Sequence, residues 1–231
     1  MASGRKDYFK IIYANIQLKL VSTELGNEEA QLIQLNRMND VLKKFLARFN
    51  SFSEPEINTI VANTRIEYFK RGSVILEEGK ITNKCFFVIK GCLRQYRMVD
   101  GEEKTTGFFT EGQPAVLYSS YLNRVSSDYS LSCIEDSMLT TGTREQEQNF
   151  HKESPNLEHL VHILMSQDYT RVEKHVELLN FHKPEERYKL LMKTQPSLLN
   201  RVPLHQIASY IGVTPESFSR IRKRLMRSDN Q

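Results

Sequence analysis

Hydrophobic and polar positions follow three patterns along the chain, and each pattern predicts a different kind of structure. In residues 41–49, apolar side chains recur at helical spacing. In residues 65–141, short runs rich in Ile, Val, Phe and Tyr alternate with glycines about 7 to 12 residues apart. Helical spacing returns after Pro155 and continues, with interruptions, to the end of the chain. The sequence therefore predicts an α+β protein, with a β-rich region in residues 38–150.

The β-rich region is predicted to be antiparallel. Its strand-like runs lie at residues 66–69, 74–76, 85–89, 93–99, 104–109, 129–134 and 137–141. Short strands at this spacing, separated by glycine turns, are typical of a barrel, a roll or a sandwich. Asp100-Gly101 is a strong signal for a hairpin between two of these strands.

Helices are expected before the first strand. Residues 41–49 predict one helix, and a second should follow from Ser53, its cap, to about Asn63. Residues 1–37 form an N-terminal extension with some apolar residues near helical spacing. A packing helix, a tail and a start site at Met38 are all open for this extension, and we assign it no function.

Residues 151–182 predict a linker followed by one long helix, capped by Ser154 with Pro155 in its first turn. Packing on its own domain alone is one interpretation of this helix. We favour a dimerisation helix, because about 28 residues span roughly 40 Å, more than a small β domain covers. Its near-heptad seam consists of Val161, Met165, Tyr169, Val172, Val176 and Leu179.

The sequence LHQIASYIGVTPESFSRIRK, residues 204–223, predicts a helix-turn-helix within a C-terminal domain of residues 183–231. Ile207 and Ile211 lie one helical turn apart and share a face. Gly212 follows where the first helix must end, because glycine tolerates the left-handed conformation of helix ends. The second helix should then start just beyond this turn.

The second helix of the motif should present a polar, basic face to solvent. Arg and Lys contact phosphates or guanine edges, Glu accepts from cytosine, and Ser binds phosphate. A helical hairpin with a merely solvated face is the alternative, but the coincidence of turn, cap and basic face favours DNA. The predicted DNA-binding residues are Thr214 (also the helix cap), Glu216, Ser217, Ser219, Arg220, Lys223 and Arg224.

Charge points to the same end of the chain. The net charge of +4 is mild and does not by itself imply nucleic acid. Residues 201–231, however, contain six Lys or Arg against two acids, so the positive excess is concentrated there.

The three cysteines, Cys85, Cys92 and Cys133, show no metal spacing. A sparse, odd set fits a reducing cytoplasm, where we expect the protein, and a role as small buried residues is favoured over redox sensing. The sequence has no uninterrupted apolar run of about 18 residues and no secretory signal, so we expect no membrane partner.

A glycine-punctuated antiparallel region, a long helix and a C-terminal helix-turn-helix, in this order, resemble the Crp/Fnr superfamily of bacterial transcription regulators. The resemblance covers residues 38–227 and is most specific between Pro184 and Arg222. It implies a jelly roll like that of cyclic-nucleotide-binding domains in residues 38–150, and a homodimer on a palindromic double-stranded operator. RNA polymerase and an unknown small-molecule effector are further partners that it leaves open.

The same resemblance assigns roles within the second helix. Glu216 and Arg220 would contact base edges, with Ser217 and Ser219 at the backbone or at bases. Pro215 stands where the family often has Arg, so the base preference should differ from that of the best-known members. Residues 200–203 are too short for the β-hairpin wing that many members carry.

The effector segment departs from the family pattern. Members that bind cyclic nucleotides use Gly-Glu-Leu for the ribose and Arg-Ser or Arg-Thr for the phosphate. In register with Gly112, this chain has Val116, Leu117 and Tyr118, then Ser127 and Asp128. Leucine cannot accept the ribose hydrogen bond, serine cannot neutralise phosphate, and aspartate repels it. One lost charge-assisted contact costs about 1.5–3 kcal/mol.

We therefore predict a degenerate pocket that binds neither cyclic AMP nor cyclic GMP. Arg124 is the nearby cation, and an exposed loop arginine is favoured over a site for another anion. The residues assigned to this pocket are Val116, Leu117, Arg124, Ser127 and Asp128.

No cofactor, metal site or catalytic site is predicted. Three scattered cysteines are too few for a four-thiolate iron–sulfur cluster, and the six histidines show no haem or metal spacing. His159 and His162 are three residues apart and could bind a metal, but surface positions on a helix are favoured. The sequence has no nucleophile elbow, P-loop or GxGxxG motif, so an enzyme is not expected.

Two functions are compatible with these patterns. The favoured one is a homodimeric, sequence-specific DNA-binding regulator of transcription. The alternative is a ligand-binding or protein-interaction module whose helix-turn-helix packs on a partner. The alternative predicts weak, salt-insensitive DNA binding, whereas phosphate contacts make binding strongly salt-dependent.

Overall fold

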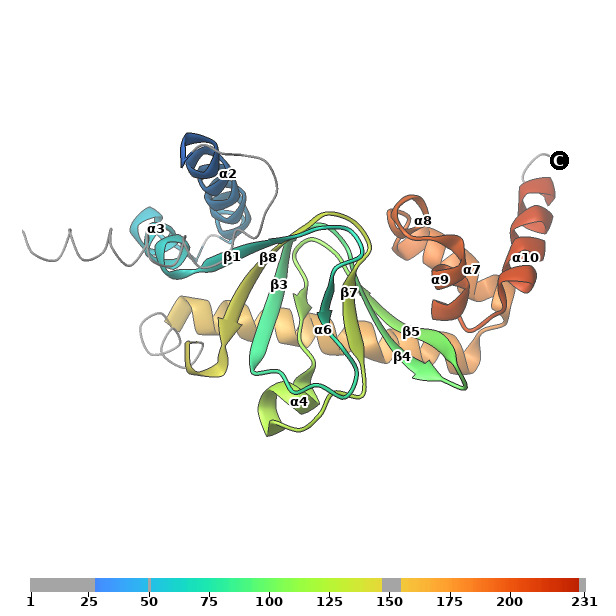
Figure 1. Ribbon diagram of the computed structural model, residues 1–231. Helices are drawn as coiled ribbons and strands as arrows, with labels where there is room; N and C mark the ends of the chain where they lie inside the picture. Colours follow the sequence, from blue (N-terminus) through green and yellow to red (C-terminus); the bar gives the residue numbers. More distant parts are fainter. Residues whose placement is uncertain (1–27, 50, 147–154, 229–231) are drawn as a thin grey trace, which may run out of the picture. The chain divides into compact units, whose positions relative to one another are not determined.

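The computed structural model describes residues 28–49, 51–146 and 155–228. The chain divides into two units, Met1–Arg37 and Met38–Gln231, and the second contains the β region and the C-terminal helices (Figure 1). The expectations for residues 1–27, and for Ser154 as a helix cap, fall outside the described residues.

Two helices precede the first strand, α2 (Glu28–Leu46) and α3 (Glu54–Asn63). α2 begins well before the predicted start near residue 41. α3 confirms its prediction, because a capping box holds its first turn. The Ser53 N–H donates to the Glu56 carboxylate at 2.8 Å, and the Glu56 N–H donates to Ser53 Oγ at 3.5 Å.

The β region is a roll of two four-stranded antiparallel sheets, as the sequence predicts. The short strand β6 and the helix α4 (Tyr118–Asn123) were not predicted. The first sheet has the order β1 (Arg65–Phe69), β8 (Ser137–Thr143), β3 (Lys84–Lys90) and β6 (Pro114–Ala115). The second has the order β2 (Val74–Leu76), β7 (Ser130–Cys133), β4 (Leu93–Val99) and β5 (Glu102–Phe109).

Local sequence explains two tight points of the roll. Asp100 and Gly101 have φ angles of 53° and 80°, so both adopt the positive φ that the predicted hairpin between β4 and β5 needs. At Gly91 (φ 110°), an added Cβ would lie 2.2 Å from Ser137 Oγ, which leaves room for glycine alone. The roll interior is filled by side chains such as Val88, Leu93 and Leu139.

A single long helix, α6 (Pro155–Phe181), runs from the roll to the C-terminal helices (Figure 1). One side of it packs on the roll through Leu160 and Leu164. The predicted long helix is therefore present, with one buried and one exposed side.

The C-terminal helices are α7 (Pro184–Thr194), α8 (Leu198–Arg201), α9 (Leu204–Tyr210) and α10 (Pro215–Ser228). α8 was missed, because residues 198–203 were expected to lead directly into the helix-turn-helix. One apolar cluster joins these helices to the outer side of the second sheet. From the roll it includes Cys92, Phe108 and Ile134.

Candidate nucleic-acid interface

The turn between α9 and α10 depends on glycine. Gly212 has a φ of 71°, and the Val213 N–H donates to the Ala208 carbonyl at 2.9 Å. A Cβ at this position would lie 3.0 Å from Arg187 Nη1 and 3.3 Å from Leu179 Cδ2. Arg187 in turn donates to the Ile211 carbonyl at 3.0 Å. The turn is thus held by a positive φ, close packing and an arginine from α7.

The start of α10 is capped as predicted. The Ser217 N–H donates to Thr214 Oγ1 at 3.3 Å, and Pro215 is the first residue of the helix. This cap leaves the first turn of α10 facing solvent with its polar side chains in place.

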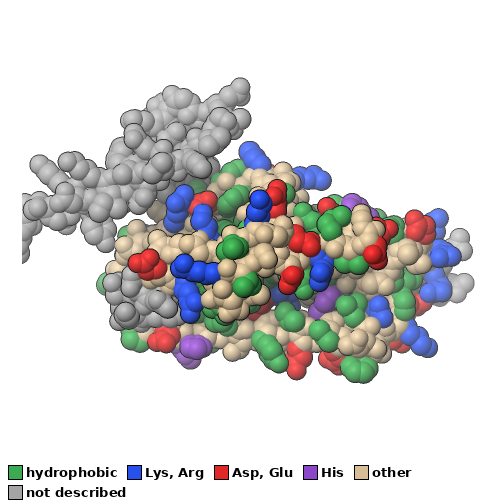
Figure 2. Space-filling view, turned by 60° about the horizontal axis from the view of Figure 1, so that its bottom comes forward, with side chains coloured by type: hydrophobic (Ala, Val, Ile, Leu, Met, Phe, Trp, Pro, Cys, Tyr) green, Lys and Arg blue, Asp and Glu red, His purple; other side chains and the backbone are tan. Residues whose placement is uncertain are grey.

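α10 has a buried apolar side and an exposed polar side. Phe218, Ile221 and Leu225 are buried and belong to the cluster that includes the fully buried Ala208 of α9. Ser217 is half-buried. The exposed side carries the other predicted DNA-binding residues of the helix: Glu216, Ser219, Arg220, Lys223 and Arg224. In Figure 2, Lys and Arg side chains gather at the end of the molecule where α10 lies.

Two of these arginines have partners. Arg220 Nη2 donates to Ser217 Oγ at 3.2 Å. Arg224 Nη2 lies 2.5 Å from Glu185 Oε2 of α7, while its side chain stays largely exposed. Lys189 and Arg224 both lower the pKa of Glu185. Arg224 is therefore oriented by α7 and remains accessible to an anion.

Arg222 does not belong to this face. It is half-buried, and its guanidinium lies 6.0 Å from the centre of the Phe218 ring. The sequence alone gives a weak signal for this difference, since Arg222 follows the buried Ile221 by one position on the helix.

The helix-turn-helix docks on the β4–β5 hairpin through contacts that the sequence did not reveal. The Thr105 N–H donates to Ser209 Oγ at 2.9 Å. Tyr210 stacks on His175 of α6, with ring centres 4.1 Å apart, and meets the edge of Phe108. These contacts join residues more than 30 positions apart in the sequence, so no local sequence pattern predicts them.

A second docking point is an ionic cluster. Arg201 of α8 lies 2.8 Å from Glu111 Oε1 and 2.5 Å from Glu135 Oε1, both in the roll. These carboxylates raise the pKa of Arg201 and so favour its charged form. The C-terminal helices are thus tied to the roll by charge as well as by the shared apolar cluster.

The predicted dimer seam is largely exposed in the single chain. Met165, Tyr169, Val172 and Val176 leave 41%, 71%, 47% and 52% of their surface exposed. Val161 is half-buried. Leu179 is also half-buried and packs against Gly212, so it serves the helix-turn-helix of its own chain. Met165, Tyr169, Val172 and Val176 thus form an exposed apolar stripe along α6.

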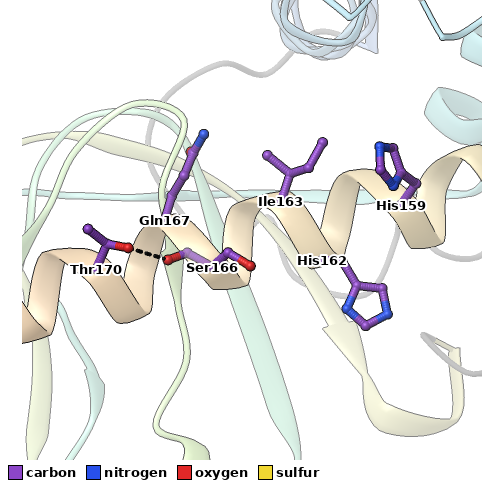
Figure 3. Close-up of a pocket in the computed structure, with 6 residues that line it drawn as sticks. All are labelled: His159, His162, Ile163, Ser166, Gln167 and Thr170. Atoms are coloured by element: carbon purple, nitrogen blue, oxygen red, sulfur yellow. Dashed lines mark hydrogen bonds between the residues drawn. The ribbon is translucent and has the colours of Figure 1, made fainter.

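Another part of the α6 surface carries an open pocket, which is lined by six residues of this one helix (Figure 3). His159 and His162 point to different sides of the helix in this view. Among the described residues, no group of three or more His, Cys, Asp or Glu is placed to hold a metal ion.

The predicted effector residues differ in burial and in their contacts. Leu117 is buried in the roll interior, and Ser127 is buried with its Oγ donating to the Tyr129 carbonyl at 2.8 Å. Asp128 is exposed. Arg124 is exposed at the end of α4 with a φ of 55°. Val116 lies half-buried beside these residues.

The side of the second sheet that faces α6 is occupied by an ion pair. Arg171 donates to Asp168 Oδ1 at 2.8 and 3.0 Å. The Arg171 guanidinium lies 4.7 Å from the centre of the Phe109 ring and beside Gly107. Both side chains of the pair are mostly buried, so the arginine is already neutralised where it packs on the roll.

Two of the three cysteines, Cys92 and Cys133, have the buried character that the sequence favours. Burial raises the pKa of Cys92 to about 12 and that of Cys133 to about 11, so both are thiols at neutral pH. Cys85 is half-buried. None of the described helices is long and apolar enough to cross a membrane.

A comparison with known protein families gives a match for the β-roll. Residues 66–153 match the family of the cyclic nucleotide-binding domain. The comparison with curated proteins found no match.

Several solved structures share the fold over about three quarters of this chain. FixK2 from Bradyrhizobium japonicum matches with a TM-score of 0.61 and 18% identity, over 72% of this chain and 86% of that one. CLP, the c-di-GMP-responsive global regulator of Xanthomonas campestris, has a TM-score of 0.61 and 15% identity, over 75% of this chain and 91% of that one. TTHA1359 of Thermus thermophilus, a regulator of the CRP/FNR family, has a TM-score of 0.55 and 18% identity, over 71% of this chain and 87% of that one. Residues 66–153 are thus similar to a cyclic nucleotide-binding domain, and the chain has the fold of the Crp/Fnr transcription regulators.

Proposed function

We propose that the protein is a homodimeric transcription regulator that binds a palindromic DNA site through α10. The observation that carries the proposal is the division of α10 into a buried apolar side and an exposed side with Arg220, Lys223 and Arg224. A helix held this way by a helix-turn-helix can enter the major groove without unpacking its core.

The exposed side chains fit distinct parts of a DNA site. Glu216 and Arg220 lie in the first half of α10, the part that reaches base edges in helix-turn-helix complexes. Arg can bind guanine with two hydrogen bonds, and Glu can accept from cytosine. Lys223 and Arg224 lie further along the helix and suit phosphates.

The exposed stripe on α6 supports the dimer. A second copy that packs its own α6 against Met165, Tyr169, Val172 and Val176 would remove this apolar surface from water. Such a pair would carry two α10 helices related by a two-fold axis. Two half-sites about one helical turn apart, roughly 34–36 Å, are the matching target.

The roll supports a regulator without a cyclic nucleotide. Leu117 and Ser127 stand where the family pattern calls for a ribose acceptor and a phosphate cation, and both are buried in other contacts. Asp128 adds a negative charge beside that position. We therefore propose that cyclic AMP and cyclic GMP are not ligands of this protein.

Selection from a random DNA library with purified protein and no added ligand tests the proposal. We expect an enriched two-fold palindrome, with affinity that falls by about 10³-fold or more between 50 and 200 mM salt. The double variant Glu216→Ala, Arg220→Ala should lose the palindrome. Weak, salt-insensitive binding without enrichment would instead support an interaction module.

A further inference from the structure

An apolar cavity of about 260 Å³, partly open to solvent, lies beside the first sheet. Its walls come from the first sheet, the ends of α2 and α3, the start of α4 and the first turns of α6. The function proposed above assigns no ligand to this cavity. It is more enclosed than the open pocket on α6.

The cavity walls are firmly packed. Leu160 and Leu164 of α6 and Tyr121 of α4 are buried, and the Phe45 and Phe87 rings lie 4.7 Å apart between centres. Walls from four helices and one sheet limit how far the space can collapse. A preformed apolar cavity of this kind is the usual form of a small-molecule site.

The charge of the lining limits the ligand. Of the described lining residues, only Arg65 is charged, and its Nε lies 2.9 Å from Glu67 Oε1. The Cys85 thiol donates to the Gly142 carbonyl at 3.4 Å. A charged ligand would lose its hydration here and meet no uncompensated opposite charge, so the site favours an uncharged one.

The volume of the cavity further limits the class of ligand. An apolar protein cavity of about 150 Å³ binds benzene. The cavity here is less than twice that volume, which corresponds to a two-ring aromatic or an aliphatic molecule of similar size. We propose that this cavity is a binding site for an uncharged, mainly apolar small molecule of that size.

The position of the cavity connects two regions that matter for regulation. Val116 and Tyr118, from the segment that holds the effector in cyclic-nucleotide-binding relatives, form part of its wall. Val161 and Met165, at the start of the dimer seam, form another part. A bound molecule would therefore touch both the roll and the dimerisation helix. Its role as an effector rests on the proposed function, whereas the binding site does not.

The first experiment measures binding of 1-aminonaphthalene to the full chain by fluorescence. This two-ring probe is uncharged at pH 7, and its emission rises in apolar surroundings. We expect saturable binding with a Kd of about 100 µM or tighter. The absence of a saturable signal would overturn the proposal.

Filling variants locate the site. Val116→Phe and Gly142→Val add carbons from two different walls, and a Cβ at Gly142 meets only Cys85 Sγ, at 3.6 Å. Each variant should weaken the binding of 1-aminonaphthalene by at least tenfold. Val125→Phe, on the exposed loop after α4, is the matched control and should bind like the wild type.

The filling variants also test whether the space is real. Because the added carbons enter empty volume, both variants should melt at or above the wild-type temperature. Unfolding of both variants, or wild-type binding by both, would contradict the proposal. An alternative occupant, the partner's α6, would make the probe compete with dimerisation, so binding would weaken as protein concentration rises.

DNA affinity measured with and without 1-aminonaphthalene separates the two proposals. A change of threefold or more that is lost in Val116→Phe would assign the cavity an effector role. Probe binding with unchanged DNA affinity would keep the site and remove that role. DNA selection that succeeds while the probe does not bind would overturn the site and leave the proposed function intact.

Discussion

We propose that α10 contacts DNA and that residues 116–128 do not hold a cyclic nucleotide, and these two segments are built differently. In α10, the residues that hold the core and those that face solvent are separate sets. In residues 116–128, Leu117 and Ser127 would have to contact an effector, but both are part of the packed roll. Substitutions on the exposed side of α10 should therefore leave stability unchanged, whereas a polar ligand site at residues 116–128 would require changes in the packed core.

The largest expected effect is on the stability of the roll. Leu117→Glu restores the residue type that holds ribose in cyclic-nucleotide-binding relatives, but it places a carboxylate among apolar side chains such as Leu131 and Leu139. We expect a loss of about 3–5 kcal/mol in the free energy of unfolding. Urea denaturation followed by circular dichroism measures it.

The control for this change is Asp128→Ser in the same segment. Asp128 is exposed, so its replacement should alter the free energy of unfolding by less than about 0.5 kcal/mol. A Leu117→Glu protein as stable as the wild type, or one that binds cyclic AMP, would show that the segment is still a working site.

The next effect concerns the exposed stripe of α6. Tyr169→Glu places a charge on a side chain that is 71% exposed in the single chain and would be buried between two helices of a dimer. We expect a monomer in sedimentation, with palindrome affinity reduced by about 10²-fold or more, because the linked second half-site is lost. The control is Gln167→Glu, at a residue that lines the open pocket of α6 in Figure 3, and this variant should remain dimeric. A dimeric Tyr169→Glu protein would place the interface elsewhere.

The exposed side of α10 gives a smaller expected effect, on DNA affinity and not on stability. Arg220→Ala should weaken binding to the selected palindrome by about 1–3 kcal/mol, roughly 5- to 150-fold, and relax the preference at one base. The melting temperature should not change, because Arg220 is exposed. Lys90→Ala, an exposed cation at the end of β3, is the control and should bind like the wild type. Equal losses in both variants would indicate that only general charge matters.

Periodicity and turn chemistry predicted most of the fold. The capping box at Ser53, the Asp100-Gly101 hairpin and the Gly212 turn are each set by a few adjacent residues, so the sequence alone was sufficient. α4 and β6 were missed because the segment after Gly112 has neither a clear strand period nor a helical one. α8 was missed because four residues are too few for a pattern.

The candidate site was predicted in the same uneven way. The outward set on α10 follows from helical spacing, because the buried stripe fixes which residues face solvent. The docking of Ser209 on Thr105 and of Arg201 on Glu111 and Glu135 joins residues 66 to 104 positions apart. Such pairings depend on how the sheets close, which no local pattern in the sequence specifies.

The smallest expected effect lies at the junction of α6 and the helix-turn-helix. His175 stacks on Tyr210, and its Nδ1 is buried with no hydrogen-bond partner among the described residues. Burial and the neighbouring Arg171 lower the pKa of His175 from 6.5 to about 4. Folding therefore favours the neutral ring.

This depressed pKa makes the junction sensitive to acid. Above pH 6.5, His175 is neutral in both the folded and unfolded chain, so it adds no pH dependence. As the pH falls from 6.5 towards 4, the unfolded chain binds the proton first, and the free energy of unfolding decreases. We expect His175→Phe, which keeps an aromatic ring against Tyr210, to lose about 1 kcal/mol less than the wild type between pH 7 and pH 5, once the partial exposure of the ring is allowed for. Urea denaturation at both pH values measures the difference, with Ser166→Ala on the exposed side of α6 as the control. Parallel behaviour of wild type and His175→Phe would mean that the helix-turn-helix does not hold this histidine neutral, and that its docking on α6 is looser than the stacked rings indicate.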